Sequence, residues 1–355
     1  MKITHTLLFL APCACWGISM THTITGSSAT DTSNPYIALG AGFDAVAYID
    51  IGGSASGQGS FKGTGTLVMS TDGNFKLLSA AHNFDSDKNG VVDQTSFGIY
   101  FGDAIDTGDL GSSTAARVYV TGASVSWNAK WHSPTPGGFN LSATGPDDPL
   151  TGGAAQYDVA VISFTAAQIF SGTLPTPMAV SLENPLGQTI TSVGYGNHGL
   201  GNSFANSDDA TRRAMHNVAD VVGYSDSSAA NTGYTIQADF DSPTDTGKSS
   251  LGANTPVPSI SGLLEGATAG GDSGGPVLYN GKVAGVLNGG FNPVGNVSEY
   301  GDRSIWAAMS EQSNMEFLIA SGVAVPEPEE TAALVAAGLA GFAWVRRQRR
   351  GDRKA

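Results

Sequence analysis

The segment ATAGGDSGGPVLYNGKVAGVLNGG, residues 267–290, places three glycine pairs around a single Asp-Ser dipeptide. Two short apolar runs, PVLY and KVAGVL, follow that dipeptide and have the composition of strands. Glycine lets a chain turn tightly and lets a substrate approach the backbone closely. The segment therefore predicts strands next to a tight turn that carries Ser273. A glycine-rich turn capped by Asp272 has the same composition, so a role for Ser273 depends on a base and an acid elsewhere.

Similar short runs rich in Val, Ile, Tyr and Phe recur along the chain and are separated by turn residues. We expect strands within 44–51, 63–70, 74–82, 97–102, 116–125, 157–164, 189–196, 220–224, 234–240, 274–280 and 282–290. A helical period first appears at 304–322, where Ile305, Met309 and Phe317 share one face. Polar stretches between 200 and 256 indicate long surface loops. The pattern predicts an all-β fold that ends in one helix.

The composition agrees with an exported globular protein. Of 355 residues, 48 are glycine, 41% are hydrophobic and only 14% are charged, which excludes a helical bundle and a disordered chain. The net charge of −14 disfavours binding to nucleic acid or anionic lipid. Both cysteines, Cys13 and Cys15, lie in the first apolar segment, so removal of that segment leaves no disulfide.

Both ends of the sequence have the composition of processing signals. Residues 1–25 combine Lys2 with a short apolar run, as in a secretory signal peptide. Residues 325–350 contain Pro-Glu-Pro at 326–328, an uncharged run at 331–345 and then a basic cluster. This order resembles the PEP-CTERM sorting signal of Gram-negative bacteria, which implies export and removal of the tail by an exosortase. A simple tail anchor is the alternative, and in either case membrane contact is confined to this segment.

Three short segments, taken together, point to nucleophilic catalysis. His82 ends the apolar run KLLSAAH, Asp158 precedes the apolar run VAVISF, and Ser273 lies in GGDSGGP. Each residue alone has an ordinary structural explanation, because buried histidines, strand-start acids and glycine-rich turns are common. Of the other histidines, His132, His198 and His216 stand in polar or mixed surroundings, and we expect them at the surface.

The order SAAH, YDVAVISF and GGDSGGPV resembles that of the chymotrypsin/trypsin-like serine endopeptidases across most of residues 35–320. The resemblance implies two antiparallel β-barrels within a protease domain at 35–322, with His82 as general base, Asp158 as orienting acid and Ser273 as nucleophile. It also implies an oxyanion hole from the N–H groups of Gly271 and Ser273. The same order excludes an α/β-hydrolase, in which the serine precedes the histidine.

The chain departs from this family pattern at the specificity pocket and at the activation site. The resemblance assigns Ala267, Asn288 and Gly290 to the pocket, and Ala267 stands where cleavage after Lys or Arg requires an aspartate. We therefore expect a preference for apolar or small side chains. The family's IVGG activation sequence is missing; Ile37 is the nearest candidate for a new terminus that pairs with Asp272, unless Asp272 has an internal donor.

An acidic sequence follows His82. Asp85, Asp87, Asn89 and Asp93 form the pattern D-x-D-x-N-G-x-x-D, with oxygen ligands at spacings that suit a hard cation such as Ca²⁺. The closing glutamate of an EF-hand is absent, and an acidic turn without an ion is the alternative. Any such Ca²⁺ is structural, because the chemistry of a serine triad requires no cofactor.

The sequence thus predicts a secreted serine endopeptidase, extracellular or at the cell surface of a Gram-negative bacterium, that acts on polypeptides and binds no nucleic acid. Two alternatives remain: a catalytically inactive binding or structural protein on the same fold, and an esterase that uses the same residues. The presence of all three triad residue types argues against the first alternative, and spacing does not separate the second.

Overall fold

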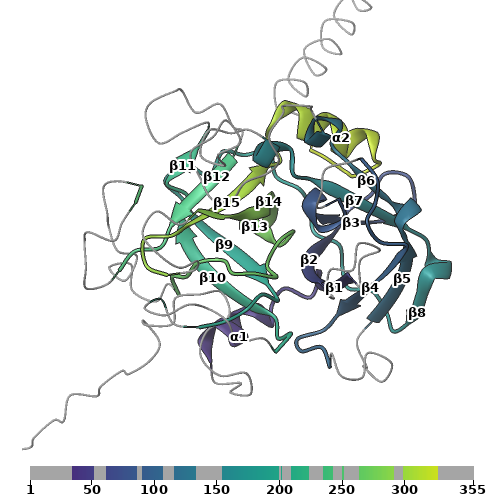
Figure 1. The fold of residues 1–355 in the computed structure, drawn as a ribbon, viewed down its shortest axis with the longest axis horizontal. Coiled ribbons are helices and arrows are strands. Elements are labelled where there is room, and N and C mark those ends of the chain that lie inside the picture. Colours follow the sequence, from purple (N-terminus) through teal and green to yellow (C-terminus); the bar gives the residue numbers. More distant parts are fainter. Residues whose placement is uncertain are drawn as a thin grey trace, which may run out of the picture.

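The computed structural model describes residues 34–51, 61–85, 90–106, 116–132, 154–199, 201, 209–223, 235–242, 250–251, 264–291 and 299–326. These residues form two curled antiparallel sheets that follow each other in the sequence (Figure 1). The first sheet has the strand order β6-β7-β3-β2-β1-β4-β5-β8, and the second has the order β10-β9-β13-β14-β15-β12-β11. The division by sequence means that each half of the chain builds its own sheet.

The bounds of the elements are as follows. The first sheet contains β1 (Val46–Ile51), β2 (Phe61–Val68), β3 (Phe75–Ser79), β4 (Ser96–Phe101), β5 (Ala116–Thr121), β6 (Val125–Trp127), β7 (Ala160–Phe164) and β8 (Ile169–Ser171). The second contains β9 (Thr189–Gly194), β10 (Arg213–Val218), β11 (Val221–Val222), β12 (Thr235–Asp239), β13 (Pro276–Tyr279), β14 (Lys282–Phe291) and β15 (Arg303–Ala308). The α-helices are α1 (Pro35–Gly40) and α2 (Gln312–Ala320), and single 3-10 turns include η1 (Ala81–Asn83) and η5 (Ala154–Tyr157).

Strand β1 of the first sheet buries both of its faces. In β1, Ala47 and Ile49 point into the interior of the first half, while Val46 and Tyr48 point to a second core. Side chains of a strand alternate between its two faces, so a run that is apolar at nearly every position suits a strand buried on both. Strand β7 behaves in the same way, with Val161 on the opposite side from its neighbours.

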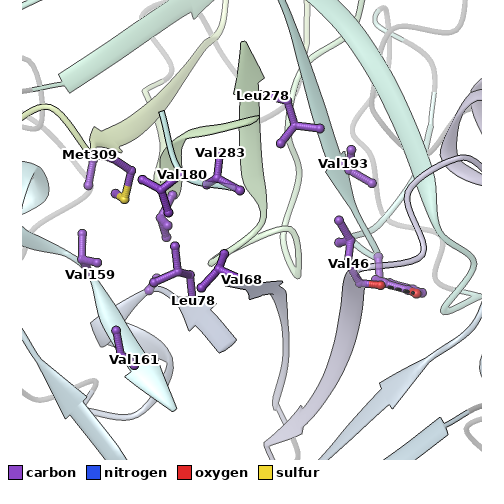
Figure 2. Close-up of a cluster of buried hydrophobic side chains, with 14 of the residues drawn as sticks. Val46, Val68, Leu78, Val159, Val161, Val180, Val193, Leu278, Val283 and Met309 are labelled. Carbon is purple, nitrogen blue, oxygen red and sulfur yellow. Dashed lines mark hydrogen bonds between the residues drawn. The ribbon is translucent and has the colours of Figure 1, made fainter. Parts of the chain in front are cut away.

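The second core joins the two halves. Val68, Leu78 and Val161 of the first sheet pack in one cluster with Val193, Leu278 and Val283 of the second half (Figure 2). Burial of apolar surface contributes about 25 cal/mol per Å², so this shared cluster holds the two sheets together. A third cluster, around Trp306 and Met215, fills the interior of the second half and also contains Tyr36 of α1. Residues from the facing strands therefore hold fixed positions relative to one another.

The structure confirms the predicted class: a mostly β chain with two antiparallel sheets and a C-terminal helix. The prediction of a helical period over 304–322 is wrong in its first part. Residues 303–308 form β15, which is buried throughout and pairs with both β14 and β12, and only Gln312–Ala320 is helical. Pairing on two sides satisfies the backbone of this segment, so the tertiary setting overrides the local pattern.

The expectation of loops between 200 and 256 misses a strand. Strand β10 lies in this range and pairs with β9 over six residues. Arg213, at its start, is fully buried and forms two hydrogen bonds with the Asp209 carboxylate, at 2.7 and 2.5 Å. A charged side chain can be buried when an opposite charge pairs with it in this way. The segment that contains Arg213 therefore forms a strand, although it is as polar as a loop.

Candidate active site

His82 and Asp158 form a close pair where strand β3 ends and strand β7 begins. Strands β3 and β7 pair in register from Phe75↔Phe164 to Ser79↔Ala160, so the turns at their ends lie side by side. His82 stands in η1, directly after β3, and Asp158 stands between η5 and β7, two residues before the strand. The structure therefore brings together two residues that are 76 positions apart.

The Asp158 carboxylate fixes the orientation of the His82 ring. Asp158 is fully buried, and its Oδ1 accepts the His82 backbone N–H at 2.9 Å. Its Oδ2 lies 2.5 Å from His82 Nδ1, while the imidazole keeps a side-chain exposure of 23%. A proton on Nδ1 makes this contact a hydrogen bond to the carboxylate and leaves Nε2 as the basic nitrogen. The pair thus consists of a buried acid and a partly exposed base.

Asn288 is a third member of this group. Its Nδ2 donates to Asp158 Oδ2 at 2.6 Å, and the side chain is 2% exposed. The register of β14 against β15 shifts between Leu287 and Gly289, and such an irregularity takes one side chain out of the regular alternation of a strand. The resemblance assigns Asn288 to a specificity pocket, and in the structure its amide contacts the Asp158 carboxylate. A buried carboxylate needs such donors to remain charged.

The turn that carries Ser273 is anchored to the first half of the chain. The Ser273 carbonyl oxygen accepts the Thr64 backbone N–H at 2.8 Å and Asn83 Nδ2 at 3.0 Å. Thr64 Oγ1 donates to the Gly271 carbonyl oxygen at 3.0 Å. Because Asn83 is the residue next to His82, one hydrogen bond connects the serine turn to the segment that carries the histidine.

The backbone amides of the serine turn fall into two groups. The N–H groups of Asp272, Gly274 and Gly275 donate to carbonyl oxygens of Ala269, Leu287 and Asp272, at 2.7–3.0 Å. The N–H groups of Gly271 and Ser273 donate to no acceptor within the part of the chain that the structure describes. These two amides are the ones expected to form an oxyanion hole, and they remain available for a ligand.

The other residues expected near the site occupy several settings. Ala267 is buried in a small cluster with Phe240 and Tyr300, whose rings lie 4.9 Å apart. Gly290 is half-buried and pairs with Ser304 of β15. Ser304 Oγ also accepts the N–H of Thr268 at 3.0 Å, which ties the segment after Ala267 to β15. Ala267 thus packs with two aromatic side chains.

Of the four predicted cation ligands, the structure describes two. Asp85 is buried and follows η1, with its N–H on the Ala81 carbonyl oxygen; the Asp93 N–H donates to the Phe84 carbonyl oxygen. Asp87 and Asn89 lie outside the described residues. Across the described residues, no group of three or more His, Cys, Asp or Glu side chains is arranged to hold a metal ion. The calcium site stays a prediction.

Two histidines expected at the surface are not fully exposed. His198 is buried, and its Nδ1 lies 3.9 Å from Asp209 Oδ1. His216, in β10, is half-buried, and burial lowers its pKa. The predicted signal peptide lies outside the described residues, as does most of the predicted sorting segment. None of the helices within the described ranges combines the length and hydropathy required to cross a membrane.

Comparisons with known proteins give a likeness in structure and none in sequence. No protein-family model and no curated protein sequence matches the chain. Among solved structures, the chain is similar to neuropsin, a serine protease expressed in the limbic system of mouse brain, with 16% sequence identity and a TM-score of 0.43. The match covers 79% of this chain and 96% of the other. A likeness at this level concerns the course of the chain and bears on neither its activity nor its substrate.

Proposed function

We propose that this protein is an exported serine endopeptidase that cleaves polypeptides through Ser273, His82 and Asp158. The observation that carries the proposal is the buried Asp158 carboxylate on His82 Nδ1, next to Asn83, which donates to the Ser273 carbonyl oxygen. An orienting acid, a base and a serine within one hydrogen-bonded unit are the parts that acyl transfer requires.

In the proposed reaction, Ser273 Oγ attacks the carbonyl carbon of the peptide bond, and His82 Nε2 takes the serine proton. The N–H groups of Gly271 and Ser273 stabilise the oxyanion that develops. Collapse of the tetrahedral intermediate breaks the C–N bond, and His82 gives its proton to the leaving amine. Water then attacks the carbonyl carbon of the acyl-enzyme while His82 Nε2 takes its proton. Collapse of this second intermediate breaks the C–O bond to Ser273, whose oxygen recovers the proton from His82, and Asp158 stabilises the imidazolium that forms in each half of the reaction.

The substrate preference follows from the apolar setting of Ala267. A basic side chain in this region would find no acid at position 267, and burying an unpaired cation is costly. The proposal therefore includes cleavage after apolar or small residues. Three further parts of it rest on sequence alone: export by residues 1–25, removal of residues 325–350 by an exosortase, and a structural Ca²⁺ at Asp85–Asp93.

The test is labelling of the purified protein with a fluorophosphonate probe, which reacts with activated serines. We expect wild-type protein to be labelled and the Ser273→Ala and His82→Ala variants to lose the label. Ser310→Ala is the matched control, because Ser310 is also half-buried in a turn. Digestion of casein and of a peptide library then separates a peptidase from an esterase. Absence of label in properly folded wild-type protein would contradict the proposal and favour an inactive binding protein.

Chelation of calcium during the same assay tests the cation site. Loss of label or of stability in the presence of chelator, restored by added Ca²⁺, is the expected result. Unchanged labelling and an unchanged unfolding transition would show that the acidic loop holds no ion that matters to the fold.

A further inference from the structure

The carboxylate of Asp272, the residue before the candidate nucleophile, is enclosed beneath the serine turn. Its Oδ1 accepts the Gly196 N–H at 2.6 Å, and its Oδ2 accepts the Ala269 N–H at 2.9 Å. A Cβ at Gly194 would overlap Oδ1, and one at Gly196 would lie 2.5 Å from the carboxyl carbon. Two glycines thus form a close-fitting cradle around this side chain. Burial raises the pKa of Asp272 to about 7, against the effect of both backbone N–H donors.

Two cations from different strands act on this carboxyl group. Lys62 of β2 and Arg213 of β10 both attract its charge and lower its pKa. Arg213 is already paired with the Asp209 carboxylate through two hydrogen bonds. Lys62 stands opposite Asp50 in the β1–β2 register. Lys62 is therefore a cation of the first half of the chain that acts on the buried acid of the second half.

The Lys62 side chain lies directly against the serine turn. Gly271 has a φ of +98°, and a Cβ at this position would overlap Lys62 Cε and lie 3.1 Å from its Cδ and Cγ. The Nζ atom at the end of this stem is buried. Two residues further along β2, Thr64 holds the carbonyl oxygens of Gly271 and Ser273. One strand thus supplies both a charge and hydrogen bonds to the turn.

The segment around Ile37 is built into the fold of the intact chain. Ile37 lies in α1, whose Asn34 side chain caps the helix by accepting the Tyr36 N–H at 2.9 Å. Tyr36 is buried, and its hydroxyl donates to the Glu265 carbonyl oxygen at 2.6 Å. A cut before Ile37 would divide this helix between a buried residue and its neighbour. Release of an Ile37 ammonium would thus disrupt contacts that the uncleaved protein makes.

We propose that Lys62 is a positioning residue for the candidate active site: its side chain, packed against Gly271, supplies a counter-charge for the Asp272 carboxylate and sets the serine turn in the uncleaved chain. The inference rests on the proposed function, since the turn matters only if Ser273 reacts. In this arrangement Lys62 takes the role that the ammonium of a new chain terminus, created by proteolysis, would otherwise have. The protein would then need no cleavage near Ile37 to become active.

The first experiment measures the rate of fluorophosphonate labelling against pH for full-chain protein whose residues 30–40 are shown by mass spectrometry to be intact. We compare wild type with Lys62→Met, Lys62→Arg and a control, Lys76→Met. Lys76 is another lysine of the first sheet, and its buried side chain contacts Asp72 and Ser163. The control therefore reports the general effect of losing a buried lysine.

We expect intact wild-type protein to be labelled. Lys62→Met should move the rising part of the pH profile upward by about one pH unit, a roughly tenfold loss of rate at fixed pH in that range. Lys62→Arg should restore the wild-type profile, and Lys76→Met should leave its midpoint unchanged. Identical profiles for Lys62→Met and wild type, or labelling that appears only after cleavage near Ile37, would overturn the inference.

A second readout does not depend on activity. The pH dependence of urea unfolding is measured for Lys62→Met in the wild-type background and in an Asp272→Asn background. If Lys62 stabilises the ionised acid, its loss lowers stability more above pH 7 than below it, and Asp272→Asn abolishes this difference. If the two substitutions are coupled in stability but no variant is labelled by the probe, the interaction between Lys62 and Asp272 stands and the proposed peptidase activity is contradicted. No coupling would refute the role of Lys62 whatever the activity.

Discussion

Substitution of Gly274 by alanine tests the link between the serine turn and the first half of the chain. Gly274 has a φ of +83°, and its Cβ would overlap Ser79 Oγ and the Thr64 carbonyl oxygen and lie 2.8 Å from the Ala80 nitrogen. Two of these three atoms belong to the backbone, and the third, the Ser79 hydroxyl, donates to the Thr64 carbonyl oxygen at 2.8 Å. None of these groups is the free end of a flexible side chain, so the turn itself must move.

The expected cost has two parts. The left-handed conformation costs a non-glycine residue about 1–2 kcal/mol. Overpacking of a close-packed site costs about 1–3 kcal/mol more. Gly274→Ala should therefore lower the free energy of unfolding by about 2–5 kcal/mol, a large share of the roughly 5–15 kcal/mol that is typical of folded proteins. Movement of the turn should also weaken the hydrogen bonds to Thr64 and Asn83 and slow labelling of Ser273.

Gly281→Ala provides the matched control. Gly281 has a φ of +71° in the turn between β13 and β14, and a Cβ there would meet no atom within 4 Å. It should show the conformational part alone, about 1–2 kcal/mol. Urea unfolding of both variants gives the difference directly, and we expect about 1–3 kcal/mol. Equal losses of stability, with equal labelling rates, would refute the argument that Ser79 and Thr64 confine the serine turn.

Three other predictions concern polar groups. Asn288→Ala removes a hydrogen bond to the Asp158 carboxylate that is worth about 1.5–3 kcal/mol. Labelling of the serine should therefore slow at least tenfold while the protein stays folded. An unchanged labelling rate would count against the role of Asn288. Arg212→Met removes donors from two buried carbonyl oxygens and should cost about 2–4 kcal/mol in urea unfolding, whereas neutralising its exposed partner Asp44 should change little. Burial raises the pKa of the Glu265 carboxyl group to about 8. The contribution of this group to stability is therefore present below pH 4.5 and is lost as the pH rises through 8. Glu265→Gln should flatten this decline in stability, and a variant profile that runs parallel to the wild-type profile would contradict the assignment.

Much of the fold could be predicted because its strands are locally apolar. The run at 44–51 supplies side chains to cores on both faces of β1, and such a run has few alternatives to a buried strand. Strand β10 could not be predicted in this way, because Arg213 is buried by its pairing with Asp209 rather than by apolar character. Strand β15 was missed because its sequence is compatible with a helix until β12 and β14 are present on either side.

The residue types of the candidate site could be predicted from the sequence, but the residues that hold them in place could not. A carboxylate ahead of an apolar strand and a histidine at the end of another are visible in the sequence, and pairing of β3 with β7 brings them together. Asn288 gives no such signal, because its contact with Asp158 depends on a local register shift in β14. Lys62 also gives no signal in the sequence, because its role depends on the packing of the serine turn against its side chain.

The contacts that position Ser273 cross the boundary between the two halves of the chain. Thr64 and Asn83 belong to the first half and hold a turn of the second half through its backbone. The apolar cluster between the halves is what keeps these partners in place, since each hydrogen bond alone contributes only about 1 kcal/mol. It follows that a loosened interface should abolish serine reactivity before either sheet unfolds. Labelling lost at lower urea than the far-ultraviolet circular dichroism signal would bear this out, and coincident transitions would show that the two halves and the site unfold as one unit.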